Sequence, residues 1–202
     1  MLFAVTWLIL GLTAGCAQPI ANRDSKGEAI ICFGDSLTQG QGAEAGRDYP
    51  AQLARILGRP VVNAGSSGET TRDALMRIDR DVLLKNPRLV VVEFGGNDFL
   101  KNVSLEETLR NLDEVVGRIE DAGAMVALAE VRTAIFTDPY LEGFRQIARK
   151  RKALLIPDLL KGIMDNASLK SDHIHPNAEG YRVMAQRVYK YIKPLVAGPG
   201  IK

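Results

Sequence analysis

A serine stands in a glycine-flanked turn near the start of the chain, within residues 34–40 (GDSLTQG). The turn follows residues 29–33, an apolar run that is typical of a strand. A serine at the end of a strand can hold its hydroxyl clear of the backbone, where a substrate reaches it. Taken alone, the turn is consistent with a nucleophile at Ser36, an ordinary turn or a loop that cradles a phosphate.

A carboxylate and a histidine lie three residues apart near the other end of the chain, in residues 172–176 (DHIHP). The proline disfavours helix for the residue before it. In such an extended stretch Asp172 can fold back to hold one ring nitrogen of His175, which leaves the other nitrogen free to take a proton from Ser36. The alternative base, His173, directly follows Asp172, where a productive contact is harder to make. We therefore predict that His175 is the base.

Two further loops follow apolar runs, at residues 63–70 (NAGSSGET) and 95–98 (GGND). Glycine lets the main chain approach a ligand closely and offer its N–H. The side-chain amide of Asn97 can donate to a developing oxyanion. Either loop could also be a plain turn or, in the first, the start of a helix capped by Thr70 or Thr71. Their shared position after strands favours a site.

The elements that must position these residues alternate along the chain. Amphipathic helices are predicted after Ser104, where Glu107 completes a capping box, from Asp138, and after Pro176. Continuously apolar strands, typical of a sheet covered on both faces, are predicted at residues 29–33, 61–62, 89–94, 124–129 and 153–156. This alternation predicts an α/β fold with a parallel sheet and helices on both faces. Functional groups gather beyond the carboxyl ends of such strands.

The first sixteen residues differ from the rest. Residues 2–12 are apolar but too short for a typical spanning helix, and Cys16 follows the small residues Ala14 and Gly15. This pattern resembles the lipobox of bacterial lipoproteins, in which the cysteine is lipidated and tethers the protein to a membrane. A plain secretory signal or an uncleaved anchor is the alternative. We expect residues 1–16 to be a signal peptide, 17–27 a linker and 28–197 the domain.

Composition is that of one ordinary soluble domain. Of 202 residues, 46% are hydrophobic and 25% charged, and the net charge is only +2. The dense basic run at residues 145–152 lies on a predicted helix, and we interpret it as a solvated face rather than a nucleic-acid surface. With only two cysteines, and Cys16 a candidate for lipidation, no disulfide framework is expected. Cys32 fits a small buried hydrophobe.

Together the four loops resemble the GDSL/SGNH hydrolases, most closely the branch with thioesterase I/lysophospholipase L1 and arylesterase-like lipoproteins. The blocks GDSLTQG, NAGSSGET, VEFGGND and DHIHPN carry the likeness, which runs from about residue 28 to 195. The resemblance implies a three-layer α/β/α fold with a five-stranded parallel sheet in flavodoxin-like order. It also implies Ser36 as nucleophile and, through its N–H, as an oxyanion donor. Gly68 would donate by its N–H and Asn97 by its side chain, and Asp172 and His175 would complete the triad.

The expected function is therefore hydrolysis of a small carboxylic ester or thioester. No cofactor or metal is expected, because the second histidine has no ligand cluster around it. The alternative is a catalytically silent lipid- or acyl-binding lipoprotein module on the same fold. Family relatives are often monomers, and we expect a monomer here, exported from a bacterium to the periplasm or held at a membrane by its lipid. Either an acyl pocket or core packing would explain the apolar residues Phe99, Leu100, Ile135 and Phe136.

Overall fold

Five parallel strands form one sheet in the order β2-β1-β3-β4-β5. This is the flavodoxin-like order, so the predicted fold is confirmed. The computed structural model describes residues 19–132 and 138–197. The predicted signal segment with Cys16, together with Ile135 and Phe136, lies outside the described residues. The strands are β1 (Ala29–Gly34), β2 (Val62–Gly65), β3 (Pro87–Glu93), β4 (Met125–Ala129) and β5 (Leu154–Ile156).

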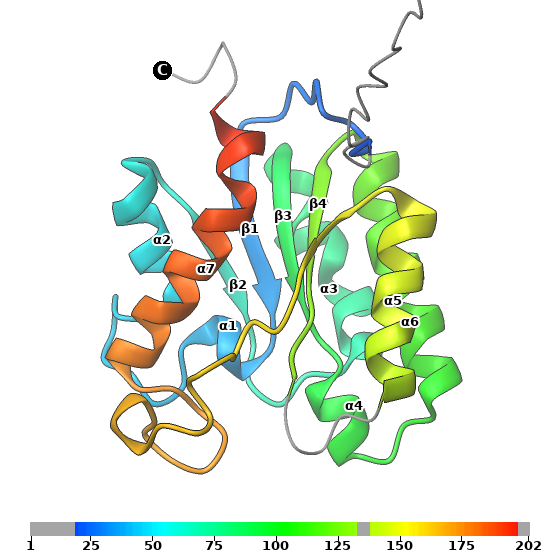
Figure 1. Cartoon of the computed structure of the whole chain (residues 1–202). Helices are drawn as coiled ribbons and strands as arrows, with labels where there is room; N and C mark the ends of the chain where they lie inside the picture. Colours follow the sequence, from blue (N-terminus) through cyan, green and yellow to red (C-terminus); the bar gives the residue numbers. More distant parts are fainter. Residues whose placement is uncertain (1–18, 133–137, 198–202) are drawn as a thin grey trace, which may run out of the picture.

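Helices cover both faces of this sheet (Figure 1). One face carries α2 and α7, and the other carries α3, α5 and α6, which gives the three predicted layers. The short helices α1 and α4 follow the carboxyl ends of β1 and β3. The helices are α1 (Ser36–Gln39), α2 (Tyr49–Leu57), α3 (Thr71–Asp81), α4 (Gly96–Leu100), α5 (Leu105–Asp121), α6 (Asp138–Arg151) and α7 (Ala178–Val196), with 3-10 turns at Leu83–Lys85 and Ala167–Leu169.

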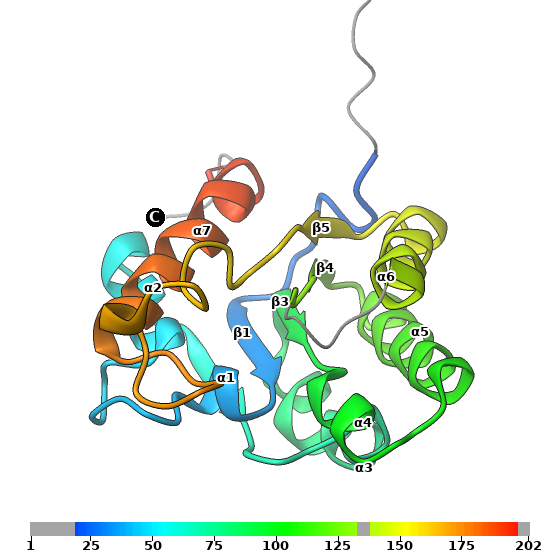
Figure 2. The same cartoon turned by 60° about the horizontal axis from the view of Figure 1, so that its bottom comes forward.

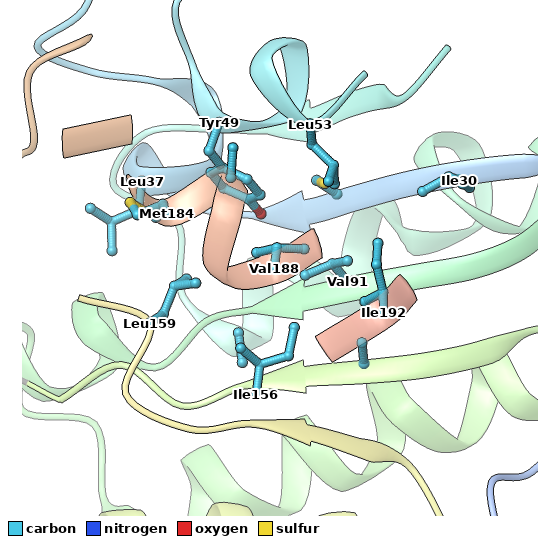
Figure 3. Packing of buried hydrophobic residues seen from close by; sticks show 14 of the residues in the cluster. Ile30, Leu37, Tyr49, Leu53, Val91, Ile156, Leu159, Met184, Val188 and Ile192 are labelled. Atoms are coloured by element: carbon cyan, nitrogen blue, oxygen red, sulfur yellow. The ribbon is translucent and has the colours of Figure 1, made fainter. Parts of the chain in front are cut away.

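The sheet separates two hydrophobic cores, because successive side chains of a strand point to opposite faces of the sheet. Ile30 packs with α2 and α7, whereas Ile31 packs with α3, α5 and α6. Both faces of the sheet are therefore dry at its centre, which explains why β1 and β4 are apolar throughout. Figure 3 shows the core under α2 and α7, where the labelled side chains include Tyr49, Leu53, Val188 and Ile192.

The helix starts largely agree with the sequence, with one exception. Ser104 caps α5 and accepts the N–H of Glu107 at 3.2 Å. The second half of the predicted capping box is wrong, because the Glu107 carboxylate pairs with Arg72 of α3 instead of turning back to Ser104. A complete capping box forms at the start of α3, between Thr70 and Asp73.

The basic run on α6 is a set of paired charges. Lys150 and Arg151 both contact Asp113 of α5, and Arg149 contacts Glu142 within α6. This pairing supports the interpretation of the run as a solvated helix face.

The described part of the predicted linker (residues 17–27) begins at residue 19 and contacts the domain. The Asn22 side chain donates to the carbonyl groups of Glu120, at 2.8 Å, and Ala124, at 3.0 Å. Ile20 packs against the core. Asn22 therefore joins this segment to the end of α5 and to the turn that leads into β4.

We predict that Asn22→Ala lowers the free energy of unfolding by about 1–3 kcal/mol, because two hydrogen bonds are lost and part-buried carbonyl groups remain. Denaturant unfolding measures this change. Asp24→Ala is the control, since Asp24 is exposed in the same segment, and it should change stability by less than about 0.5 kcal/mol. Equal effects of the two substitutions would mean that the Asn22 hydrogen bonds contribute nothing to stability.

Candidate active site

Ser36 is the first residue of α1, directly after β1, at the edge of the sheet that Figure 2 brings forward. Asp35 caps this short helix, with Oδ1 accepting the N–H of Leu37 at 3.0 Å. Position 34, directly before Asp35, must be glycine, since a Cβ on Gly34 would lie 2.1 Å from Oγ1 of Thr38. The close packing of this turn fixes the backbone of Ser36 while its side chain stays partly exposed.

His175 lies between Ser36 and Asp172. Its Nε2 is 3.0 Å from Ser36 Oγ, and its Nδ1 is 2.8 Å from Asp172 Oδ2. The imidazole is buried, with 7% of His175 exposed, whereas the Asp172 side chain is 48% exposed. Hydrogen bonds from His175 and from the N–H of Ile174 lower the pKa of Asp172 to about 2. An ionised Asp172 accepts a hydrogen bond from Nδ1–H, which leaves Nε2 as the acceptor for the Ser36 hydroxyl.

The loop that carries these two residues is closed on itself. Lys170 and Pro176 form an isolated antiparallel bridge, and the N–H of Ser171 donates to the carbonyl of His175 at 3.0 Å. Asp172 Oδ1 also accepts the backbone N–H of His175, at 2.8 Å. The predicted fold-back of Asp172 is therefore the geometry observed. His173, the rival base, is exposed and makes no hydrogen bond to another described residue.

Asn97 lies at the start of α4, beside the Ser36 turn. Its Nδ2 donates to Asp35 Oδ2 at 3.0 Å and to the carbonyl of Glu69 at 2.9 Å, so both amide hydrogens have acceptors. Gly68 precedes Glu69 in the neighbouring loop and has a φ of +76°. Its carbonyl accepts a hydrogen bond from Nζ of Lys101 at 2.7 Å. Gly68 does not line the cavity beside Ser36, whereas Asn97 does.

An apolar cavity of about 70 Å³ adjoins the Ser36 side chain and His175. The predicted pocket residues Phe99 and Leu100 both line it, and Leu100 is more than half exposed at its mouth. The other apolar lining residues are Leu37, Val131, Leu160 and Ile174. This wall fits an apolar acyl group better than a charged one.

Two buried carboxyl groups lie behind Ser36, and the sequence analysis missed their role. Asp35 is 4% exposed and Glu93, at the end of β3, is 1% exposed; their side chains are hydrogen-bonded to each other. Burial raises the pKa of Asp35 to about 6 and raises the pKa of Glu93 well above its usual value. Two adjoining carboxylates do not both ionise readily, so each of the two acids makes it harder for the other to lose its proton. The only sign of this pair in the sequence was the acidic residue Glu93 within a run of apolar residues.

Arg77 of α3 was missed as well. Its guanidinium donates to the carbonyl groups of Gly34, at 3.0 Å, and Ala64, at 2.9 Å, and it pairs with the Glu69 carboxylate. It also stacks 4.5 Å above the ring of Phe33. One buried cation therefore joins the ends of β1 and β2 to the loop that contains Gly68.

Within the described ranges, no group of three or more histidine, cysteine, aspartate or glutamate side chains could hold a metal ion. The polar groups beside the cavity are instead a hydroxyl, an imidazole, a carboxylate and amide donors. That set is suited to acyl transfer through a nucleophilic serine.

Known proteins share both the sequence pattern and the fold. The GDSL-like lipase/acylhydrolase family model matches residues 32–183. The chain is 31% identical to thioesterase 1/protease 1/lysophospholipase L1 of Escherichia coli over 86% of this chain and 88% of the relative. It is 27% identical to esterase TesA of Pseudomonas aeruginosa over 92% and 98%. The solved structure of the psychrotrophic esterase EstA from Pseudoalteromonas is similar, with a TM-score of 0.75 at 26% identity, over 84% of this chain and 99% of that one.

The family match covers most of the chain and includes every element that carries the site. The five-stranded parallel sheet is also that of the similar solved structures. The chain therefore belongs to the GDSL-like lipase/acylhydrolase family and is a carboxylic ester hydrolase.

Proposed function

We propose that this hydrolase uses Ser36 as its nucleophile, His175 as its base and Asp172 to orient the base. The observation that carries the proposal is the continuous hydrogen-bond chain from Ser36 Oγ through the imidazole to Asp172, with links of 3.0 and 2.8 Å. An imidazole that donates from Nδ1 to a carboxylate has its Nε2 lone pair free for the serine proton.

The reaction follows from this arrangement. Ser36 Oγ attacks the carbonyl carbon of an ester or thioester while its proton passes to Nε2 of His175. The imidazolium then protonates the departing alcohol or thiol, which leaves an acyl-enzyme. Water gives a proton to the same nitrogen and attacks the acyl carbonyl, and the acid is released as the Ser36 hydroxyl re-forms.

The oxyanion of each tetrahedral intermediate takes three donors in this proposal: the N–H groups of Ser36 and Gly68 and the side chain of Asn97. The Asn97 amide must then exchange one of its present acceptors for the oxyanion, since both of its hydrogens are in use. Such a donor acts only when charge develops, so its effect falls on the transition state rather than on substrate binding.

The substrate is proposed to place an apolar acyl group in the cavity lined by Phe99, Leu100 and Val131. Esters, aryl esters, acyl-thioesters, lysophospholipids and acetylated sugars share the carbonyl that the reaction needs and differ in the groups beside it. A panel of p-nitrophenyl esters of increasing chain length, with acyl-CoA and lysophospholipid alongside, ranks these classes by kcat/KM. Equal rates for all chain lengths would contradict an acyl chain in this cavity.

We propose that the protein is exported and lipidated at Cys16, which lies outside the described residues. The support is the apolar run followed by Ala14, Gly15 and Cys16. In the described part, no helix is long and apolar enough to span a bilayer. Mass spectrometry of the native N-terminus should find a diacylated or triacylated peptide that begins at Cys16. A free mature terminus at another residue would exclude lipidation.

Ser36→Ala and His175→Ala should each reduce hydrolysis of p-nitrophenyl esters by at least about 10³-fold, because the nucleophile or its base is lost. His173→Ala is the matched control for the histidine and should retain most of the wild-type rate. The reverse result for the two histidines would exclude His175 as the base.

Labelling by a fluorophosphonate distinguishes an enzyme from the silent binding module. An activated Ser36 should react within minutes and the Ser36→Ala variant should not react. A folded wild-type chain that neither reacts nor hydrolyses any ester of the panel would support the binding module.

Asn97→Ala should lower kcat by about 10²–10³-fold with a small change in KM, because one oxyanion donor is lost. Steady-state kinetics on one p-nitrophenyl ester measures both constants. Gln146→Ala serves as the control, since Gln146 also carries an amide and is exposed on α6. A loss confined to KM would assign Asn97 to substrate binding instead.

A further inference from the structure

Glu93 has no part in the proposed reaction, yet it is enclosed immediately behind the nucleophile. One of its carboxyl oxygens accepts a hydrogen bond from the Thr38 hydroxyl at 2.9 Å, and the Thr38 hydroxyl lies 3.1 Å from the Tyr49 hydroxyl. The carboxyl group also contacts Asp35, which caps α1 and holds Asn97. Burying an acid at a strand end is costly unless it is neutral or paired.

The need for such a residue comes from the double use of Asn97. Its amide holds Asp35 at rest, and it must turn toward the oxyanion if it is to stabilise the transition state. Asp35 would then be a buried carboxylate that has just lost a hydrogen bond, which costs about 1–3 kcal/mol or more for a charged group. Without compensation, that cost would be added to the reaction barrier.

Resting on the function proposed above, we propose that Glu93 is a positioning residue. Its protonated carboxyl group donates a hydrogen bond to Asp35 and so allows the Asn97 amide to turn from Asp35 to the oxyanion. Glu93 touches neither substrate nor the reacting atoms, and it acts through Asp35 and Asn97.

The charges around Glu93 favour this protonated form. Asp35 adjoins it from the cap of α1, and Asp98 of α4 adds a second acid close to Asp35. Arg77 of α3 is committed to Glu69 and Asp81. The remaining titratable groups of the cluster are the hydroxyls of Tyr49 and Tyr181, the thiol of Cys32 and the imidazole of His175. An ionised Glu93 would place a second negative charge beside Asp35, behind the forming oxyanion.

Glu93→Gln tests the proton itself, because glutamine can donate to Asp35 and accept from Thr38 but does not titrate. In the unfolded wild-type chain Glu93 loses its proton above about pH 4.5, whereas in the folded protein Glu93 keeps it to higher pH. The free energy of unfolding of the wild type therefore falls as the pH rises above about 4.5. Asp35 contributes a similar fall only up to about pH 6. Thermal unfolding from pH 6 to 8 should therefore show the Tm of Glu93→Gln rising steadily relative to wild type. Parallel curves would overturn the proposal.

Kinetics on a p-nitrophenyl ester tests the donor. Glu93→Gln keeps a donor and should keep kcat within about threefold of wild type. Glu93→Leu has no donor and should lose at least about 30-fold in kcat. KM should stay nearly unchanged, because the donor is needed only when the oxyanion forms. A Glu93→Leu variant that retains kcat would overturn the proposal, as would a Glu93→Gln variant that is as impaired as Glu93→Leu. If Glu93→Leu does not fold, the glutamine variant and the pH series decide.

Glu130→Gln is the matched control, the same change in another buried glutamate, 2% exposed, directly after β4. Its carboxylate contacts the N–H of Asp158 and the Arg145 side chain, away from Asp35. It should shift neither kcat nor the relative Tm between pH 6 and 8. Failure of the proposed function is recognised separately, since Ser36→Ala would then match wild type, while the Tm series needs no turnover.

Discussion

The Asp35 carboxylate is the junction on which the geometry of this site depends. One of its oxygens accepts the N–H of Leu37 and so fixes the first turn of α1, on which Ser36 stands. The other accepts the amide of Asn97 and so holds the start of α4 against that turn. A single side chain therefore joins the loops after β1 and β3, which are neighbours in the sheet and about sixty residues apart in the chain.

Charge is buried at this edge of the sheet in a way that the two hydrophobic cores could not tolerate. Asp98 is fully buried and accepts the backbone N–H of Thr71 at 2.9 Å, which ties α4 to the start of α3. Arg77 joins the ends of β1 and β2 from the other side. Because each of these groups has several partners, their desolvation is offset, and the loops between them are held rigidly. A fixed backbone in these loops keeps the proposed donors close to the place where the oxyanion charge develops.

Local patterns in the sequence were sufficient for the strands, for helices α5, α6 and α7 and for the Asp172–His175 pair, because each depends on residues close in the chain. Asp172 and His175 are only three residues apart in the sequence, and the helical spacing of the apolar residues predicts α5 and α7. Helix α2 was not among the predicted elements, although Asp48 caps it and Pro50 stands in its first turn.

Contacts between distant segments could not be predicted in this way. Glu107 pairs with Arg72 because α3 packs beside α5, and Asn22 reaches α5 across about one hundred residues of sequence. The same limit applies to Glu93 and Arg77, whose partners lie on other strands and loops. An acid within an apolar strand was the visible sign of Glu93, but only the fold shows that it meets Asp35.

The division of labour around α4 follows from its length of five residues. Asn97 at its start contacts Asp35 and the Glu69 carbonyl, while Phe99 and Leu100 at its end line the apolar cavity. The next residue, Lys101, binds the Gly68 carbonyl. A group that fills the cavity therefore contacts the same short helix that carries Asn97 and that Lys101 joins to the Gly68 loop. Part of the wall proposed for the acyl group and one of the three donors proposed for the oxyanion, Asn97, therefore lie on the same short helix. A change of cavity shape at this helix is expected to alter turnover as well as binding.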